Sequence, residues 1–345
     1  AMAIALYLVL QRRGAPRWLA ALATAPILLD AYQIQIEQNI MPDVMFGTCI
    51  VIGLTALLWH PRPPTIAIIT GGLALGTSAT ARQVGEILIL PALAYLLITL
   101  PRWRHLLTQA AIFTAAFALP ILGYCSVALA VTGHFRLSYT GTNELYGRIA
   151  AASGCRTLGL PRYEQPLCPA RGQAARLGID GLEHDPSSPM RAYQPPAGMT
   201  LSQVTGDFNR RVVTQQPFSV LAAIGKDALK LYAVDRVTVA GDTPVSRWQF
   251  QRGYPLYPNP RYGSPITRQV VARAGRQFGG GNPVAVGPLA SFLHTYQLDG
   301  GYTPGPLLAL ATLAGLAGTL TLLRRRTTPT QRDTARACLL TFTSA

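Results

Sequence analysis

Long runs of apolar residues, separated by short polar stretches, fill the first third of this chain and return near its end. The runs cover approximately residues 1–10, 18–36, 44–59, 65–81, 87–100, 106–132 and 306–323. Several fall short of the about 20 residues that cross a hydrocarbon core about 30 Å thick, so their ends are approximate. The pattern predicts at least six crossings by an α-helical multi-pass membrane protein.

Residues 133–305 lack such runs and are rich in Gly, Pro and Arg, which predicts a soluble domain of mixed helix and loop. One helix is expected over Leu201–Gln215, with Ser202 as its N-cap. A second is expected over Phe218–Val234, where apolar residues recur at helical spacing. Pro217 separates the two, which suits a helical hairpin or a kinked pair. The rest of the domain is expected to be loop.

Composition supports the membrane assignment. Only 13% of the residues are charged and the mean hydropathy is +0.25, whereas an average soluble domain carries about 25% charged residues. Both ends look cut: residues 1–10 form an apolar half-span without the charged region of a signal peptide, and residues 337–345 begin another apolar run. We expect a piece of a longer protein, with truncated membrane helices in 1–132, the soluble domain in 133–305, and a membrane helix, an Arg-rich loop and the start of a further helix in 306–345.

The placement of positive charge predicts the orientation. The loops 11–17, 60–64, 101–105 and 324–336 hold eleven arginines, whereas the opposite short loops, 33–43 and 82–86, hold only Arg82. By the positive-inside rule the first set is cytoplasmic, so residues 133–305 are extracytoplasmic and the protein is a multi-pass protein of the plasma membrane. That domain holds 18 basic and 10 acidic residues. Such a surface is either simply solvated or attracts anionic lipid head groups or a lipid-linked phosphate.

Two of the five cysteines, Cys155 and Cys168, fall in the soluble domain. In an oxidising compartment they are expected to form a disulfide. A metal pair is the alternative, but neither a neighbouring His nor a CxxC motif supports it. The other three, Cys49, Cys125 and Cys338, lie in apolar segments and are expected to be inert.

Candidate chemistry comes from the few carboxylates of the membrane part, because P-loop, HExxH, CxxC and GxSxG motifs are absent from the sequence. By the predicted topology Asp30, Glu37, Asp43 and Glu86 lie at the outer membrane face together with Arg82. Charged residues near a bilayer are costly and usually mark a working site. A continuous helix would put Asp30 and Glu37, seven residues apart, on one face.

Each of these residues also has a plain structural interpretation. Asp43 follows Pro42 at a helix start, where an acid complements the helix dipole. Glu37 is explained equally by a side chain facing water, and Asp30 by a hydrogen bond to a neighbouring helix. Arg82 and Glu86 are four residues apart and suited to pair with each other.

Several stretches resemble bacterial members of the GT-C superfamily, membrane glycosyltransferases that use polyprenyl-phosphate sugars. LLDAYQIQIEQNIMPDVMF (Leu28–Phe46) resembles an outer-loop region in which an acid precedes a membrane helix, and Asp43 matches that acid, although Pro42 stands where Ser is expected. Similar short motifs are ARQVGEILILPAL (Ala81–Leu93), LYGRIA, CRTLGLP and LCPA within Leu145–Ala170, and YTPGPLLAL (Tyr302–Leu310). The family's first outer loop, with its principal catalytic acid, would precede Ala1, so we expect the chain as it stands to be catalytically incomplete.

The resemblance implies a GT-C-like bundle that transfers a sugar at the outer membrane face. Asp43, with Glu37 and Asp30, would supply the catalytic carboxylates, and Arg82 with Glu86 would bind the lipid phosphate. A carboxylate cluster can hold a divalent metal ion, but no ligand spacing demands one, so no cofactor is expected. The partners implied are a polyprenyl-phosphate sugar, membrane lipid and an unspecified glycan, lipid or protein acceptor, with no nucleic acid.

Two other classes of protein compete with this hypothesis. A transporter would place ionisable residues at the bilayer midplane, which is nearly free of charge here. An assembly or scaffold protein would present its basic domain to an anionic envelope polymer, and it predicts that Asp43, Glu37 and Arg82 tolerate replacement.

Overall fold

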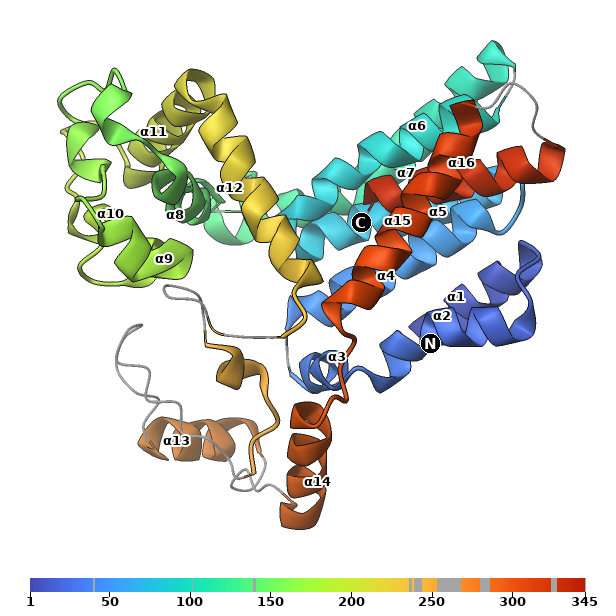
Figure 1. The fold of residues 1–345 in the computed structure, drawn as a ribbon. Helices are drawn as coiled ribbons and strands as arrows, with labels where there is room; N and C mark the ends of the chain where they lie inside the picture. The colour runs from blue at the N-terminus through green and yellow to red at the C-terminus, as the bar shows by residue number, and fades with distance from the viewer. Residues whose placement is uncertain are drawn as a thin grey trace. The chain divides into compact units, whose positions relative to one another are not determined.

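In the computed structural model of the protein, all regular secondary structure in the part of the chain that the structure describes is helical. That part comprises residues 1–39, 41–100, 102–138, 141–235, 238, 244–252, 268–279, 286–323 and 328–344. It contains α-helices and short 3₁₀ helices and no β-strand (Figure 1). The chain divides into two units: unit 1 is residues 1–138 with 301–345, and unit 2 is residues 139–300. Unit 2 differs from the expected soluble domain, 133–305, by a few residues at each boundary.

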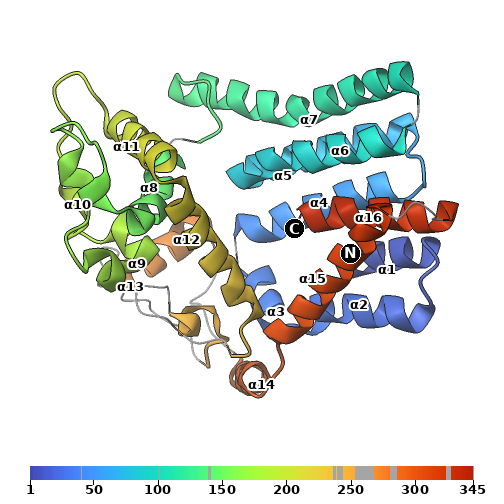
Figure 2. The ribbon, with the colours of Figure 1, turned by 45° about the horizontal axis from the view of Figure 1, so that its top comes forward.

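Unit 1 holds the apolar helices, most of which lie side by side (Figure 2). Its elements are α1 (Met2–Arg12), α2 (Arg17–Leu29), α3 (Ala31–Glu37), α4 (Pro42–Leu58), α5 (Thr65–Ala81), the 3₁₀ helix η1 (Gln83–Leu88), α6 (Ile89–Thr99), α7 (Trp103–Thr132), α15 (Gly305–Leu320), η6 (Thr321–Leu323) and α16 (Pro329–Ser344). Their common core includes Leu57, Ile68, Leu96 and Phe113, together with Leu340 from α16.

Small residues allow α5 to approach its neighbours closely. A Cβ atom on Gly76 would lie 2.1 Å from the backbone oxygen of Phe117 in α7, and one on Gly72 would lie 2.8 Å from that of Phe113. On another side of α5, a Cβ on Gly71 would lie 2.9 Å from Leu57 in α4. Such contacts are typical of membrane helices, whose association depends on van der Waals packing at small residues.

Among the residues that the structure describes, two helices are long and apolar enough to cross a membrane: α7 and the continuous segment Gly305–Leu323, formed by α15 and η6. Helices α2 and α3 pass the same test only as a pair, bent by 56° at the break between them. Helices α1, α4 and α5 and the segment Gln83–Thr99 are apolar but shorter. Helices of 17 residues, such as α4 and α5, are about 25 Å long. The structure thus supports two crossings of a membrane, or three if the bent pair forms one span.

The prediction of a continuous helix that places Asp30 and Glu37 on one face is wrong. Asp30 is not helical: its extended backbone, with φ −69° and ψ 114°, ends α2 and begins α3. Two local features favour the break. Pro26 inside α2 lacks an N–H for the helical ladder, and the Asp30 carboxylate is an N-cap that offers the next backbone N–H groups a partner.

Arginine-bearing loops of unit 1 meet at one end of the helices. Arg13, after α1, donates hydrogen bonds from Nε to the Leu58 carbonyl at 2.7 Å and from Nη2 to the His60 carbonyl at 3.0 Å. Arg12 donates to the Trp59 carbonyl and lies over that indole ring. The loops 11–17 and 60–64, expected on one side of the membrane, therefore lie together. Arg324, Arg325 and Arg326, expected on that side as well, lie outside the described residues.

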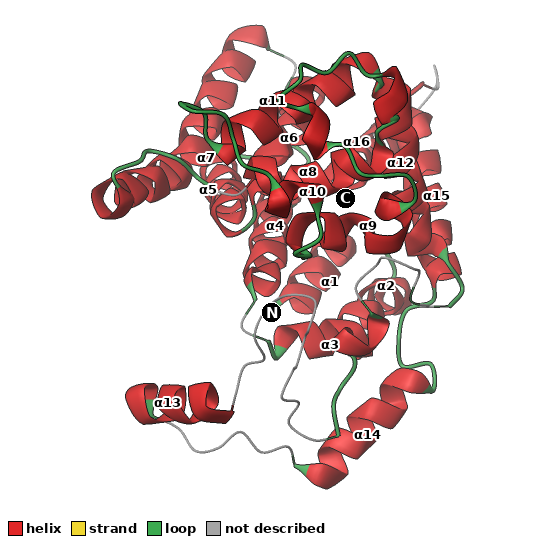
Figure 3. Ribbon diagram, turned by 90° about the vertical axis from the view of Figure 1, so that its left-hand side faces the viewer, coloured by secondary structure: helices red, strands yellow, loops and turns green. Residues whose placement is uncertain are grey.

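Unit 2 contains more helix than the sequence pattern predicts (Figure 3). Its elements are α8 (Gly141–Ala152), η2 (Cys155–Thr157), η3 (Gln165–Leu167), α9 (Gln173–His184), α10 (Pro189–Ala192), α11 (Leu201–Gln215), α12 (Pro217–Leu229), η4 (Lys230–Tyr232), η5 (Val245–Trp248), α13 (Arg268–Phe278) and α14 (Gly287–Leu298). The expectation of loop outside α11 and α12 is therefore wrong for α8, α9, α13 and α14, and for the single-turn helix α10. Helices α8, α9, α13 and α14 are short, 11 or 12 residues each, and Gly178 breaks α9 with a φ of 65°, so each offers only a few helical repeats for a pattern to show.

The predicted helix Leu201–Gln215 is confirmed, but its N-cap is Thr200 and not Ser202. The Thr200 hydroxyl accepts a hydrogen bond from the Gln203 backbone N–H, and the Gln203 side chain accepts one from the Thr200 backbone. This reciprocal capping box satisfies two N–H groups at the helix start. A cap at Thr200 therefore starts the helix at Leu201.

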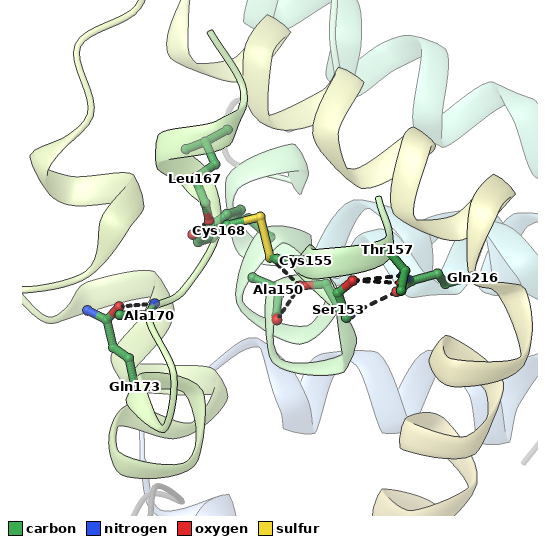
Figure 4. Close-up of a disulfide and its surroundings, with 11 residues drawn as sticks. Ala150, Ser153, Cys155, Thr157, Leu167, Cys168, Ala170, Gln173 and Gln216 are labelled. Atoms are coloured by element: carbon green, nitrogen blue, oxygen red, sulfur yellow. Dashed lines mark hydrogen bonds between the residues drawn. A yellow bond between two sulfur atoms is a disulfide. The ribbon is translucent and has the colours of Figure 1, made fainter. Parts of the chain in front are cut away.

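A disulfide joins Cys155 to Cys168, the pair expected from the sequence, with 6.0 Å between their Cα atoms. Figure 4 shows the loop that it closes and the Gln216 side chain that fastens the loop to the end of α11. Gln216 accepts from the Gly154 N–H at 2.8 Å and donates to the Thr157 hydroxyl at 2.7 Å. Within the loop the fully buried Glu164 accepts hydrogen bonds from Arg211 on both oxygens, each at 3.0 Å. Covalent and polar links thus fix this loop to α11 within unit 2.

Candidate functional site

An ion pair between Asp43 and Arg82 is the centre of the candidate site. Arg82 Nη2 lies 2.7 Å from Asp43 Oδ1, and the two side chains are 45% and 29% exposed. Asp43 stands in the first turn of α4, directly after Pro42 at the first helical position. An acid there complements the helix dipole, and Pro42 costs no hydrogen bond because the first N–H groups of a helix have no internal partner.

Arg82 is positioned by the break between α5 and η1. Its extended backbone, with φ −142° and ψ 124°, ends α5. Its N–H donates to the Ser78 carbonyl at 2.9 Å, and its carbonyl accepts from the Gly85 N–H at 2.8 Å. Gly85 packs against the end of α5 so closely that a Cβ there would lie 2.7 Å from the Ala79 nitrogen. Glycine at position 85 therefore lets the chain fold back and direct Arg82 toward α4.

The second oxygen of Asp43 is buried and lacks a hydrogen-bond partner within the part of the chain that the structure describes. Buried polar atoms are nearly always satisfied, so such an oxygen calls for an explanation. Oδ1 is held by a guanidinium while Oδ2 is left to accept a further donor. A hydroxyl group or a water molecule is a donor of the right chemistry.

The two exposed acids do not join this pair. Glu37, at the end of α3, accepts a hydrogen bond from the Gln33 side chain at 2.9 Å. Glu86 is exposed in η1, and among the described residues no ion pair connects it to Arg82. The interpretation in which Arg82 pairs with Glu86 is therefore wrong. Arg82 instead pairs with an acid 39 positions earlier in the chain.

Asp30 has a structural role. Its Oδ1 accepts the backbone N–H groups of Tyr32 and Gln33 at 2.9 and 3.1 Å, and its Oδ2 accepts that of Thr303 at 2.7 Å. The adjacent Ala31 N–H donates to the Gly301 carbonyl at 2.7 Å. These bonds tie the break between α2 and α3 to the segment that precedes α15. Sequence reasoning missed Thr303 because its contribution is a backbone N–H, which carries no residue signature.

A second group of charged residues lies in unit 2, where α8, α9 and α12 meet. Arg148 pairs with Asp227, which also lies 3.1 Å from Lys230 Nζ. Burial tends to raise the pKa of Asp227, but its bonds to Lys230 and Arg148 outweigh it and lower that pKa. Burial, with the charges of Asp180 and Glu144, raises the pKa of Glu183 to about 7. Across the described residues no group of three or more His, Cys, Asp or Glu side chains is arranged to hold a metal ion.

No family model, no curated protein and no solved structure matches the chain. The resemblance to GT-C glycosyltransferases therefore stays an expectation from short sequence motifs.

Proposed function

We propose that this protein is a multi-pass membrane glycosyltransferase that moves a sugar from a polyprenyl-phosphate carrier to an acceptor at the outer face of the cytoplasmic membrane. The observation that carries the proposal is the Asp43–Arg82 pair, with one guanidinium-bound carboxylate oxygen and one buried, unsatisfied oxygen. The predicted topology places this pair at the face where a lipid-anchored donor would present its sugar.

The pair suits the two charge changes of such a transfer. The acceptor oxygen forms a bond to the anomeric carbon, and the bond from that carbon to the phosphate oxygen breaks with its electron pair. Asp43 Oδ2 would take the proton that the acceptor hydroxyl loses. Arg82 would stabilise the negative charge that grows on the departing lipid phosphate. The half-exposed guanidinium carries five N–H donors, so binding Asp43 still leaves donors for a phosphate.

Asp30 takes no part in this chemistry, because both of its oxygens already accept backbone hydrogen bonds. Glu37 is exposed at the end of α3, and Glu86 is exposed in η1. We assign them to the surroundings of the proposed site, where they would contact the acceptor or the sugar. The proposal includes crossing of the membrane by the shorter helices α1, α4, α5 and α6.

The test uses the protein in the membranes of the cells that make it, supplied with radiolabelled polyprenyl-phosphate sugars. We expect the native protein to transfer label and Asp43→Asn to lose at least about a hundredfold of that activity, a common scale for removal of a catalytic base. Asp333→Asn is the matched control, because Asp333 is another carboxylate of unit 1 in an ion pair, with Arg336 at 3.1 Å. It should leave transfer unchanged.

Thermal stability separates a chemical role from a structural one. A partly exposed ion pair contributes at most about 1 kcal/mol, so Asp43→Asn should remain folded while its transfer is lost. Activity that survives in a folded Asp43→Asn variant would reduce Asp43 to a helix-start residue. Absence of transfer by the native protein with every common donor would favour the assembly or scaffold function.

A further inference from the structure

One face of helix α12 packs on the rest of unit 2, and the opposite face carries large, exposed apolar side chains. On the packed face Val220 joins the core of unit 2, and Asp227 forms ion pairs with Arg148 in α8 and with Lys230. Val220 and Asp227 are seven residues apart, so they lie on the same side of the helix. The contacts on this side fix the orientation of α12 within unit 2.

Ile224 is 45% exposed, but it is four residues from Val220 and so lies next to the packed side. On the opposite side Phe218 is 84% exposed, and Leu221, beside it, is 61% exposed. Leu229 continues this face, and Leu231 and Val234 beyond the helix are exposed as well. Single exposed apolar residues are ordinary, but a contiguous row along one helix usually marks an interaction surface. The sequence pattern alone would have directed Leu221 and Ile224 toward the core.

One lysine, Lys226, lies beside this apolar row, because Lys230 is bound to Asp227 on the packed side. Lys226 and Lys230 are the only lysines in a chain that otherwise uses arginine, and both fall on α12 and the turn that follows it. Lys226 is exposed between the packed and the apolar face. Lysine lays its alkyl stem along apolar surface while its ammonium stays among polar groups. An apolar helix face bordered by lysine fits the boundary between acyl chains and anionic head groups.

We propose that α12 lies on the surface of a bilayer that contains anionic lipid. Phe218, Leu221 and Leu229 insert at the level where head groups meet acyl chains, and Lys226 binds lipid phosphates. A lipid surface is the occupant that the charges favour, and the same chain carries two helices able to hold it at a bilayer, α7 and α15 with η6. The inference goes beyond sugar transfer and does not depend on it.

The experiment places an environment-sensitive fluorophore on α12 in the full chain. The free cysteines Cys49, Cys125 and Cys338 are replaced by Ala, and the Cys155–Cys168 disulfide is kept. NBD is then attached at Leu221→Cys, or at Val213→Cys as the control, because Val213 is a comparably apolar exposed position on α11. The protein is reconstituted in phosphatidylcholine vesicles with and without phosphatidylglycerol, and quenching by spin-labelled lipids is measured.

We expect quenching at position 221 by head-group and shallow acyl spin labels, stronger with phosphatidylglycerol, and none at position 213. Lys226→Gln should lower the ratio of lipid-bound to free α12 about fivefold in anionic vesicles, the effect of one lysine at such a surface. Water-like emission at position 221 without quenching would overturn the proposal. So would blue-shifted emission without lipid quenching, which means a protein cover, or strongest quenching from the bilayer centre, which means a spanning helix.

Hydrogen exchange of the unaltered chain gives the same answer without a label. Amides of residues 217–231 should exchange more slowly in anionic than in neutral vesicles, and those of α11 should exchange equally in both. Equal exchange of residues 217–231 in the two vesicles would contradict the proposal.

Discussion

The Asp30 carboxylate accepts a hydrogen bond from the backbone N–H of Thr303, with 2.7 Å between Asp30 Oδ2 and the Thr303 nitrogen, across a separation of 273 residues. The other oxygen of the same side chain caps α3. The ring of Tyr32 meets that of Tyr302 edge-on at 6.1 Å between centroids. One buried acid therefore both sets the bend between α2 and α3 and joins it to the segment that leads into α15.

Replacing Asp30 by Ala should destabilise unit 1. The change removes the α3 cap, worth about 1 kcal/mol, and leaves the Thr303 N–H without its acceptor, at a cost of about 1–3 kcal/mol. We expect a lower thermal midpoint in detergent and faster proteolysis at residues 301–304. Glu37→Ala, which removes an exposed side chain with one local hydrogen bond, is the control and should change stability by less than about 0.5 kcal/mol. Equal stability of the two variants would refute this role for Asp30.

Gly76 should tolerate no side chain, because α5 and α7 touch there. A Cβ on Gly76 would lie 2.1 Å from the Phe117 oxygen, so Gly76→Ala must push the two helices apart. Overpacking of this kind costs about 1–3 kcal/mol. Gly123→Ala in α7 is the matched control, because nothing lies within 4 Å of its added Cβ. Thermal unfolding in detergent should separate the two, and a Gly76→Ala protein as stable as Gly123→Ala would mean that the helices do not cross as described.

Loss of the disulfide should loosen the loop between Cys155 and Cys168. For a loop of this length the chain-entropy estimate is about 3 kcal/mol, and the bonds from Gln216 and Arg211 remain to hold part of it. We expect the double variant Cys155→Ser, Cys168→Ser to be cut by trypsin after the exposed Arg156 and Arg162 at least about tenfold faster. Cys49→Ala should be cut at the native rate. Unchanged cleavage of the double variant would show that the polar contacts alone hold the loop.

Deprotonation of Glu183 should weaken unit 2 as the pH rises through neutrality. Burial and the neighbouring acids raise the pKa of Glu183 from 4.5 to about 7, so the folded protein holds this proton more tightly than the unfolded chain does. The resulting stability is complete below about pH 4.5 and is lost as the pH rises through about 7, on the order of 3 kcal/mol. Asp227, whose pKa is lowered from 3.8, has the opposite effect: it adds stability as the pH rises. This gain is complete at a more acidic pH, so it does not overlap with the loss caused by Glu183.

Scanning calorimetry of the protein in detergent between about pH 5 and about pH 8 checks this sign. The native thermal midpoint should fall as the pH rises, and Glu183→Gln should remove most of that dependence. A Glu183→Gln protein that keeps the native slope would assign the titration to another group.

Local patterns in the sequence determined much of the secondary structure and part of the candidate site. Pro42 and the apolar run after it predicted the start of α4 within two residues, and the apolar run 65–81 matches α5. The helix Leu201–Gln215 and the pairing of Cys155 with Cys168 were also expected. These features depend on neighbours in the chain or on a choice between very few partners. The alternation of arginine-rich and arginine-poor loops likewise placed Asp43 and Arg82 at the same end of the helices.

Only the tertiary structure decided which groups meet. It paired Arg82 with Asp43 and not with Glu86, four residues away. It tied Asp30 to Thr303 across 273 residues and turned Leu221 outward. A local pattern indicates which residues suit a helix face or a cap, but it does not indicate which residues of other helices they contact. The partner of a charge depends on how separate helices pack, and in this chain that packing depends on glycines such as Gly72 and Gly76, which allow backbones to touch.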